Sequence, residues 1–243
     1  MTTEDTISRL ICAIDTVDHD GALDLAKKVR GVVGAIKLGL EFFTAHGPEG
    51  VKVVADVGLP IFLDLKYNDI PNTVAGGIRA AGELDPFMIT VHASGGPAML
   101  RGAMAASFRV ADAGGGRRPK VVGITVLTSF DAEDLDAVGI ERPISDQVRR
   151  LADLAQECGL DGVVASAHEI GELRAQCDPD FLLVVPGIRP AWSSAFDQKR
   201  IIAPAEALRR GADYLVVGRP ITKSNDPADA ARRIVGEMAT VMV

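Results

Sequence analysis

Three charged side chains lie within six residues of one another in the segment FLDLKYNDIPNT, residues 62–73: Asp64, Lys66 and Asp69. The apolar residues just before them predict a buried strand, and residues two apart on a strand share a face. Asp64 and Lys66 should therefore point the same way at the strand's C-terminal end. Opposite charges this close favour each other's charged form. The segment thus offers an ammonium held between carboxylates, which suits electrostatic stabilisation and proton donation.

The elements around this array follow from Pro71, which cannot donate a hydrogen bond to a sheet and disfavours helix at the residue before it. The strand should stop near Lys66, and a helix should begin at Pro71 and continue through VAGGIRAAGEL, which leaves Asp69 in the turn. Acids and lysines in such turns are also common as helix caps and solvated ion pairs. The apolar strand favours a functional interpretation, because it places the charges at the rim of a core.

The composition limits the class of protein. The chain has 243 residues, of which 47% are hydrophobic but only 5% aromatic, which favours a Val-, Ile-, Leu- and Ala-rich parallel sheet buried on both faces. Its net charge of −7 and lack of a basic run argue against a nucleic-acid partner. Three cysteines without a C-x-x-C pattern indicate a reducing compartment. The first apolar run is too short for a membrane span, so we expect a cytoplasmic protein without membrane contact.

Short strand-like runs alternate with helical patterns along the whole chain. The runs cover residues 10–15, 34–39, 61–66, 87–93, 121–127, 162–166, 181–187 and 214–218. This alternation predicts one (β/α)8 TIM barrel formed by residues 1–243. A doubly wound open sheet is the alternative, but the turn after the first strand, DTVDHDG, lacks the G-x-G-x-x-G pattern.

Chemistry in such barrels occurs at the C-terminal ends of the strands. Nearly every predicted strand ends there in a residue that can ionise or hydrogen-bond: Asp15, Lys37, Asp64, Lys66, His92, Thr128, Ser166, Arg189 and Arg219. The last two strands run into PGIRP and GRPIT, where barrels often bind phosphate. Gly218 would let the backbone approach the ligand, and arginine can bind its oxygens in a bidentate manner. The alternative is that both arginines are ordinary surface residues after glycine turns.

Together, the motifs D-x-K-x-x-D-I-P-N-T, VLTSF, PGIRP, DQKR and VVGRPIT resemble the bacterial branch of the orotidine 5′-monophosphate decarboxylase family. The resemblance extends from Asp15 to Ile221. It implies decarboxylation of orotidine 5′-monophosphate to UMP, the last step of UMP synthesis, with no metal and no cofactor. It also implies a homodimer in which Asp69, Ile70 and Thr73 reach into the neighbouring subunit's site.

The resemblance assigns roles to the other matching residues. Lys66 would protonate C6 of the pyrimidine, Asp64 and Asp69 would hold its ammonium, and Lys37 would hold Asp64. Asp64 would also face the substrate carboxylate. The remaining ligand positions are Asp15 and Lys37 for the ribose, Thr128 near the pyrimidine, and Arg189, Gln198, Gly218 and Arg219 for the phosphate and the closing loop. Trp192 and Phe196 depart from the smaller residues expected in that loop.

Three questions stay open at this point. A magnesium-dependent relative, such as a 3-keto-gulonate 6-phosphate decarboxylase or a hexulose-phosphate synthase, shares D-x-K-x-x-D but needs an acid where this chain has Lys37. A non-catalytic phosphate-binding barrel would be expected to have lost one of the charges of Asp64, Lys66 and Asp69. His92 is either an acid–base residue or a structural histidine, and we favour the structural role.

Overall fold

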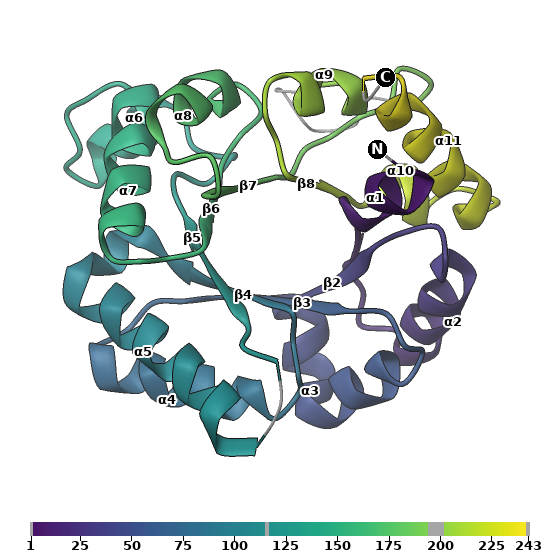
Figure 1. Ribbon diagram of the computed structural model, residues 1–243, viewed down its shortest axis with the longest axis horizontal. Coiled ribbons are helices and arrows are strands. Elements are labelled where there is room, and N and C mark those ends of the chain that lie inside the picture. Colours follow the sequence, from purple (N-terminus) through teal and green to yellow (C-terminus); the bar gives the residue numbers. More distant parts are fainter. Residues whose placement is uncertain (1, 115–116, 194–201, 242–243) are drawn as a thin grey trace.

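Eight parallel strands close into a barrel in the computed structural model, which describes residues 2–114, 117–193 and 202–241 (Figure 1). Each strand pairs with the next, and the last pairs with the first. The strands are β1 (Leu10–Ile14), β2 (Ala35–Gly39), β3 (Ile61–Tyr67), β4 (Met88–His92), β5 (Lys120–Ile124), β6 (Gly162–Val164), β7 (Leu182–Val185) and β8 (Tyr214–Val217). The predicted (β/α)8 barrel is confirmed, with all eight strands in the expected places.

Helices follow the strands and form the outer ring (Figure 1). Those expected from the sequence are α2 (His19–Val29), α3 (Leu40–Ala55), α4 (Pro71–Gly82), α5 (Gly96–Gly114), α7 (Ile144–Glu157), α8 (Ile170–Gln176), α9 (Pro204–Arg209) and α11 (Pro227–Ala239). The structure adds short helical segments: α1 (Thr3–Ser8), η1 (Ala93–Gly95), α6 (Ala132–Ala137) and α10 (Arg219–Thr222). None of the helices in the described ranges is both long and apolar enough to span a membrane.

Strand β5 is shorter than the predicted run of residues 121–127. It ends at Ile124, and the N–H of Thr125 then bonds the carbonyl of Val164 at 3.2 Å. The chain next enters a turn in which the N–H of Phe130 bonds the carbonyl of Leu127. The apolar residues after Thr125 therefore belong to a loop at the mouth of the barrel, not to its wall.

Alternate residues of each strand face either the helices or the inside of the barrel. On β3, Ile61 and Leu63 belong to the core under the helices, whereas Phe62 belongs to the inner core. Phe62 is buried next to Phe87, with ring centroids 6.4 Å apart. The next inward position on β3 is Asp64. The inner face thus changes from apolar to charged toward the C-terminal ends of the strands, and this places the ionisable groups above a packed floor.

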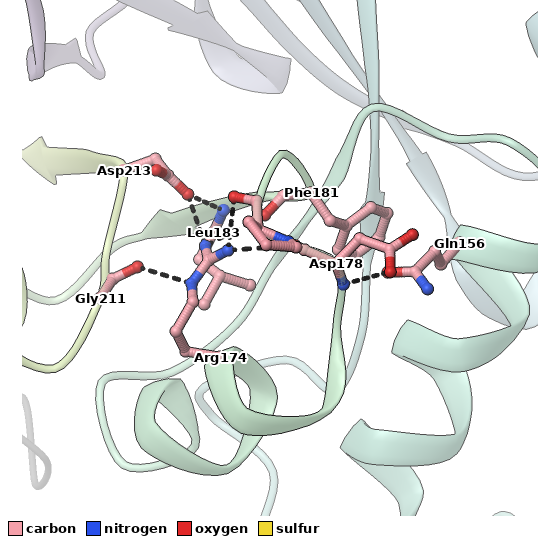
Figure 2. Close-up of polar contacts among 8 residues, drawn as sticks. Gln156, Arg174, Asp178, Phe181, Leu183, Gly211 and Asp213 are labelled. Atoms are coloured by element: carbon pink, nitrogen blue, oxygen red, sulfur yellow. Dashed lines mark hydrogen bonds and ion pairs between the residues drawn. The ribbon is translucent and has the colours of Figure 1, made fainter.

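The N-terminal ends of the strands use the same polar device twice. Asp213, just before β8, accepts hydrogen bonds from the N–H of Leu183 at 2.8 Å and from Arg174 Nη2 at 2.7 Å (Figure 2). Asp161, just before β6, accepts bonds from the N–H of Val121 at 2.7 Å and from Arg118. Each carboxylate therefore ties neighbouring strands together at the end of the barrel opposite the site.

Candidate active site

Parallel pairing of the first three strands gathers four charged side chains at the barrel mouth. Lys37 Nζ lies 3.0 Å from Asp15 Oδ1 and 3.4 Å from Asp64 Oδ2. Lys66 Nζ lies 2.8 Å from the same Asp64 oxygen. We call these four residues the charge array: Asp15, Lys37, Asp64 and Lys66. Its charges alternate along the row, and the predicted juxtaposition of Asp64 and Lys66 is present.

The backbone that carries Lys66 differs from the regular strand assumed in the sequence analysis. The pairing between β3 and β4 shifts register between Leu63 and Tyr67, and Lys66 has φ +52°, in the left-handed region. A side chain other than glycine pays roughly 1–3 kcal/mol there and stays only where its surroundings enforce it. Strand alternation therefore correctly predicted that Asp64 and Lys66 lie together. The direction of the Lys66 side chain, however, is set by a bulge and not by a regular strand.

Thr90 of β4 is the contact that holds this bulge. Its hydroxyl accepts a hydrogen bond from the N–H of Lys66 at 2.8 Å and donates one to Asp64 Oδ1 at 3.0 Å. The residue is fully buried. The sequence analysis did not single it out, although counting back by two from His92 along β4 places Thr90 on the same inward face.

Burial and charge act in opposite directions on the two central groups of the array. Burial alone would raise the pKa of Asp64, but Lys37, Lys66 and the hydroxyl of Thr90 outweigh it, so this pKa lies below its ordinary value. Burial alone would lower the pKa of Lys37, and the attraction of Asp64 and Asp15 reverses this, so its pKa lies above the ordinary value. Both groups are therefore charged at neutral pH.

Three members of the array border a cavity of about 180 Å³ at the barrel mouth. Lys37, Asp64 and Lys66 line it on one side, and Thr128 contributes a hydroxyl-bearing residue from the loop after β5. The rest of the lining is apolar: Phe62, Ile124, Val126, Leu127, Val164, Ala165, Pro186 and Val216. The cavity thus combines a mostly apolar lining with two ammonium groups and a carboxylate on one side.

His92 lies at the end of β4, half-buried above Thr90. Burial and the nearby ammonium of Lys66 lower its pKa, while Asp64 opposes the shift. The imidazole is therefore neutral at physiological pH, and it lies close enough to Lys66 and Asp64 for their charges to affect its pKa.

The turn after β3 is not brought into the site of its own chain. Residues 68–73 are all exposed, and Ile70 has 68% of its surface accessible. Asp69 accepts a hydrogen bond from the N–H of Ile70 at 2.6 Å. Within the described residues it forms no ion pair with Lys66. The array is therefore assembled without Asp69, Ile70 or Thr73.

The loops after β7 and β8 lie at the same end of the barrel. Arg189 is 94% buried, and its N–H bonds the carbonyl of Ile202 at 3.0 Å. Gly218 caps α10, whose first residue is Arg219. Neither arginine lines the cavity beside the array. Two residues named in the sequence analysis, Gln198 and Phe196, lie outside the described ranges.

Trp192, where a smaller residue was expected, packs against α11. Its Nε1 donates a hydrogen bond to Glu237 Oε1 at 2.8 Å, and the guanidinium carbon of Arg233 lies 4.1 Å from its ring centroid. Such a cation–π contact is worth roughly 0.5–1 kcal/mol at an exposed site. The large side chain therefore anchors this part of the loop after β7 to α11.

The donors near the cavity are already neutralised by lysine. Across residues 2–114, 117–193 and 202–241, no group of three or more His, Cys, Asp and Glu side chains is arranged to hold a metal ion. Lys37 sits between Asp15 and Asp64, so a divalent cation there would meet an ammonium instead of a third acid.

Comparison with known proteins places this geometry in a family. Residues 8–234 match a sequence model described as the "Orotidine 5′-phosphate decarboxylase / HUMPS family". The chain belongs to this family. The match covers the charge array, the cavity and both loops after β7 and β8.

Curated relatives narrow the choice within the family. The chain is 52% identical over 232 residues to the orotidine 5′-phosphate decarboxylase of Paramagnetospirillum magneticum, covering 96% of this chain and 99% of that protein. It is 53% identical over 234 residues to the enzyme of the same name from Rhodospirillum rubrum, covering 96% and 95%. A crystal structure titled orotidine 5′-phosphate decarboxylase from Lactobacillus acidophilus is 35% identical, with a TM-score of 0.84 and coverage of 94% and 98%.

Proposed function

We propose that the protein decarboxylates orotidine 5′-monophosphate to UMP, in de novo pyrimidine biosynthesis, without a metal or an organic cofactor. The observation that carries this proposal is the charge array at the edge of an apolar cavity, with Lys66 2.8 Å from Asp64. The names of the relatives that share about half of its sequence support the same substrate. The cysteine pattern extends the proposal to a cytoplasmic location.

The chemistry asks for an ammonium next to C6 of the pyrimidine. Breaking the bond between C6 and the carboxylate releases CO2 and leaves an electron pair on C6, in the plane of the ring. A fixed positive charge beside that carbon stabilises the electron pair without reorganisation. Lys66 provides the charge, and its Nζ then gives C6 the proton that replaces CO2. A proton from solvent restores the ammonium.

The other members of the array position this lysine. Asp64 pairs with Lys66 and also accepts the Thr90 hydroxyl, so its carboxylate is fixed from two strands. Lys37 holds Asp64 from β2 and reaches Asp15, and we assign Lys37 and Asp15 to the ribose hydroxyls. Asp64 would then face the substrate carboxylate. Thr128 lines the space that the pyrimidine would occupy.

The phosphate would lie on the other side of the mouth, at the loops after β7 and β8. Arg189 and Arg219 follow neighbouring strands, and Gly218 caps the short helix α10, which begins with Arg219. This is where TIM barrels frequently bind phosphate. We assign Gln198 to the same group of ligands. Binding energy from this remote group can be used to orient the pyrimidine against Lys66.

We further propose a homodimer that shares its active sites. The exposed turn of residues 68–73 presents Asp69, Ile70 and Thr73 at the barrel mouth, away from their own array. An isoleucine that is 68% exposed beside an acid is well suited to contact a second copy. In a two-fold dimer the same turn would complete both sites.

The magnesium-dependent alternative fits the site less well. A relative of that kind places an acid at the end of the second strand, whereas β2 here carries Lys37, which is held by two carboxylates. The ammonium would repel the cation. The non-catalytic alternative is disfavoured because all the charges of the D-x-K-x-x-D motif are present.

The test is a metal-free assay of decarboxylation. The purified protein is incubated with orotidine 5′-monophosphate in excess EDTA, and the loss of orotate absorbance is followed; we expect full activity, and none in Lys66→Ala. Activity that vanishes with EDTA and returns with magnesium would establish the metal-dependent alternative. Binding of UMP with no turnover under either condition would establish the non-catalytic barrel.

A further inference from the structure

The hydroxyl of Thr90 connects the two central features of the site. Its oxygen accepts a hydrogen bond from the backbone N–H of Lys66 at 2.8 Å, and its O–H donates one to Asp64 Oδ1 at 3.0 Å. It lies on β4, so a residue from outside the D-x-K-x-x-D segment fixes both ends of the pair that this segment supplies. The side chain has no accessible surface, so water cannot replace its hydrogen bonds without a rearrangement.

The site needs such a support for two reasons. Lys66 adopts a left-handed backbone conformation at a point where β3 and β4 lose their regular pairing, so the bond from its N–H replaces a missing ladder bond. Asp64 meets ammonium groups from two strands through one oxygen, Oδ2. The Thr90 hydroxyl satisfies the other oxygen, Oδ1, and so fixes the rotation of the carboxylate.

We propose that Thr90 is a positioning residue for the reaction: through its hydroxyl it sets the direction of the Lys66 ammonium toward the substrate. This inference rests on the proposed function. The hydroxyl acts through Asp64 and the Lys66 backbone and does not itself touch the substrate. Loss of the hydroxyl should therefore lower turnover, since a mispositioned ammonium reduces transition-state stabilisation more than it reduces nucleotide binding.

The experiment compares two substitutions at Thr90 with a matched one at Thr125. Thr90→Val keeps the shape and removes both hydrogen bonds, and Thr90→Ser keeps the hydroxyl. Thr125, directly after β5, is also buried, and its Oγ1 donates a hydrogen bond to the carbonyl of Val164 at 2.9 Å and not to the array. Thr125→Val therefore reproduces the loss of a buried hydroxyl without touching Lys66 or Asp64.

We expect Thr90→Val to lower kcat about tenfold, the scale of one lost hydrogen bond to a charged group, with UMP affinity changed less than about twofold. Thr90→Ser should recover most of kcat, and Thr125→Val should keep wild-type kcat. Equal kcat in Thr90→Val and wild type would overturn the proposal. So would an equal loss of kcat in Thr125→Val, which would show a general packing effect.

A second measurement separates this inference from the proposed function. Hydrogen exchange of the Lys66 amide reports its bond to Thr90 without any turnover. The amide should be protected in wild type and Thr90→Ser, and should exchange faster in Thr90→Val. If wild type does not decarboxylate the nucleotide, the proposed function fails whatever the exchange shows. If wild type is active and the amide exchanges equally in all variants, the bond from Lys66 to Thr90 is absent and the positioning role fails alone.

Discussion

Complementation between two inactive variants tests whether each active site is built from two chains. Lys66 belongs to the charge array of its own barrel, whereas Asp69 lies in an exposed turn and makes no ion pair with Lys66 within the described chain. We expect Lys66→Ala and Asp69→Ala homodimers each to be nearly inactive. In a mixed dimer, one site carries both defects, while the other combines Lys66 from one chain with Asp69 from the other and is intact.

The expected rate follows from counting sites. A purified mixed dimer has one intact site out of two, so it should have about half the wild-type rate. Co-expression in equal amounts with random pairing makes about half of all dimers mixed, and the unfractionated sample should then show about a quarter of the wild-type rate. Two differently tagged chains allow the mixed dimer to be isolated, its mass to be confirmed, and its decarboxylation rate to be measured.

The structure supplies a matched control for this experiment. Lys37 and Lys66 lie 3.4 and 2.8 Å from the same oxygen of Asp64, so both belong to one barrel. Mixing Lys66→Ala with Lys37→Ala must leave one defect in each site, and activity should not rise. A mixed Lys66→Ala and Asp69→Ala dimer of confirmed mass that remains as inactive as this control would show that Asp69 acts within its own chain, and the shared-site proposal would be refuted.

Three further predictions address the phosphate loops, the opposite end of the barrel and pH. Arg219→Ala should weaken UMP binding and lower kcat, partly restored by added guanidinium, and unchanged kinetics in the folded variant would remove Arg219 from the site. Asp213→Ala should cost about 2–4 kcal/mol of stability, because it leaves the Leu183 N–H and Arg174 without this partner. Thermal denaturation should show a Tm lower by roughly 4–16 °C, with kcat unchanged well below the Tm. An unaltered Tm would show that Asp213 does not tie the two strands together. Folding raises the pKa of Lys37, so this lysine stabilises the fold fully below its unfolded pKa near ~10.4, and the effect is lost as pH rises through the folded pKa. The difference in unfolding free energy between wild type and Lys37→Met, measured in urea, should therefore shrink above that pH, and a constant difference would refute this.

The strand positions could be predicted because the local sequence of each strand already favours a buried parallel strand. Each predicted run carries a buried stretch of β-branched or aliphatic residues, and Pro71 marks the start of α4 as expected. The short elements escaped prediction for a different reason. Helix α10 has four residues, too few to show a helical period. Helix α6 begins at a capping box formed by Asp131 and Asp134, a local signal that the apolar periodicity does not carry.

The charge array could be predicted only in part. Strand alternation put Asp64 beside Lys66, and the barrel put Lys37 and Asp15 at the same end. The φ of +52° at Lys66 could not be predicted, since a lysine carries no preference for that region. Nor could the role of Thr90, because the bond to it depends on a register shift between β3 and β4 that only the folded barrel reveals.

The net charge of the array suggests what the turn after β3 would contribute to the site of a neighbouring subunit. Asp15, Lys37, Asp64 and Lys66 sum to zero, so one chain alone presents a compensated row whose central carboxylate is already shared by two ammonium groups. Asp69 from a second chain would add a negative charge close to Lys66. That charge would hold the ammonium while leaving the site with excess negative charge, which disfavours the substrate carboxylate but not the neutral CO2 that leaves. The dimer would then serve the reaction itself, and for this reason loss of Asp69 should reduce turnover even where the barrel that carries Lys66 is untouched.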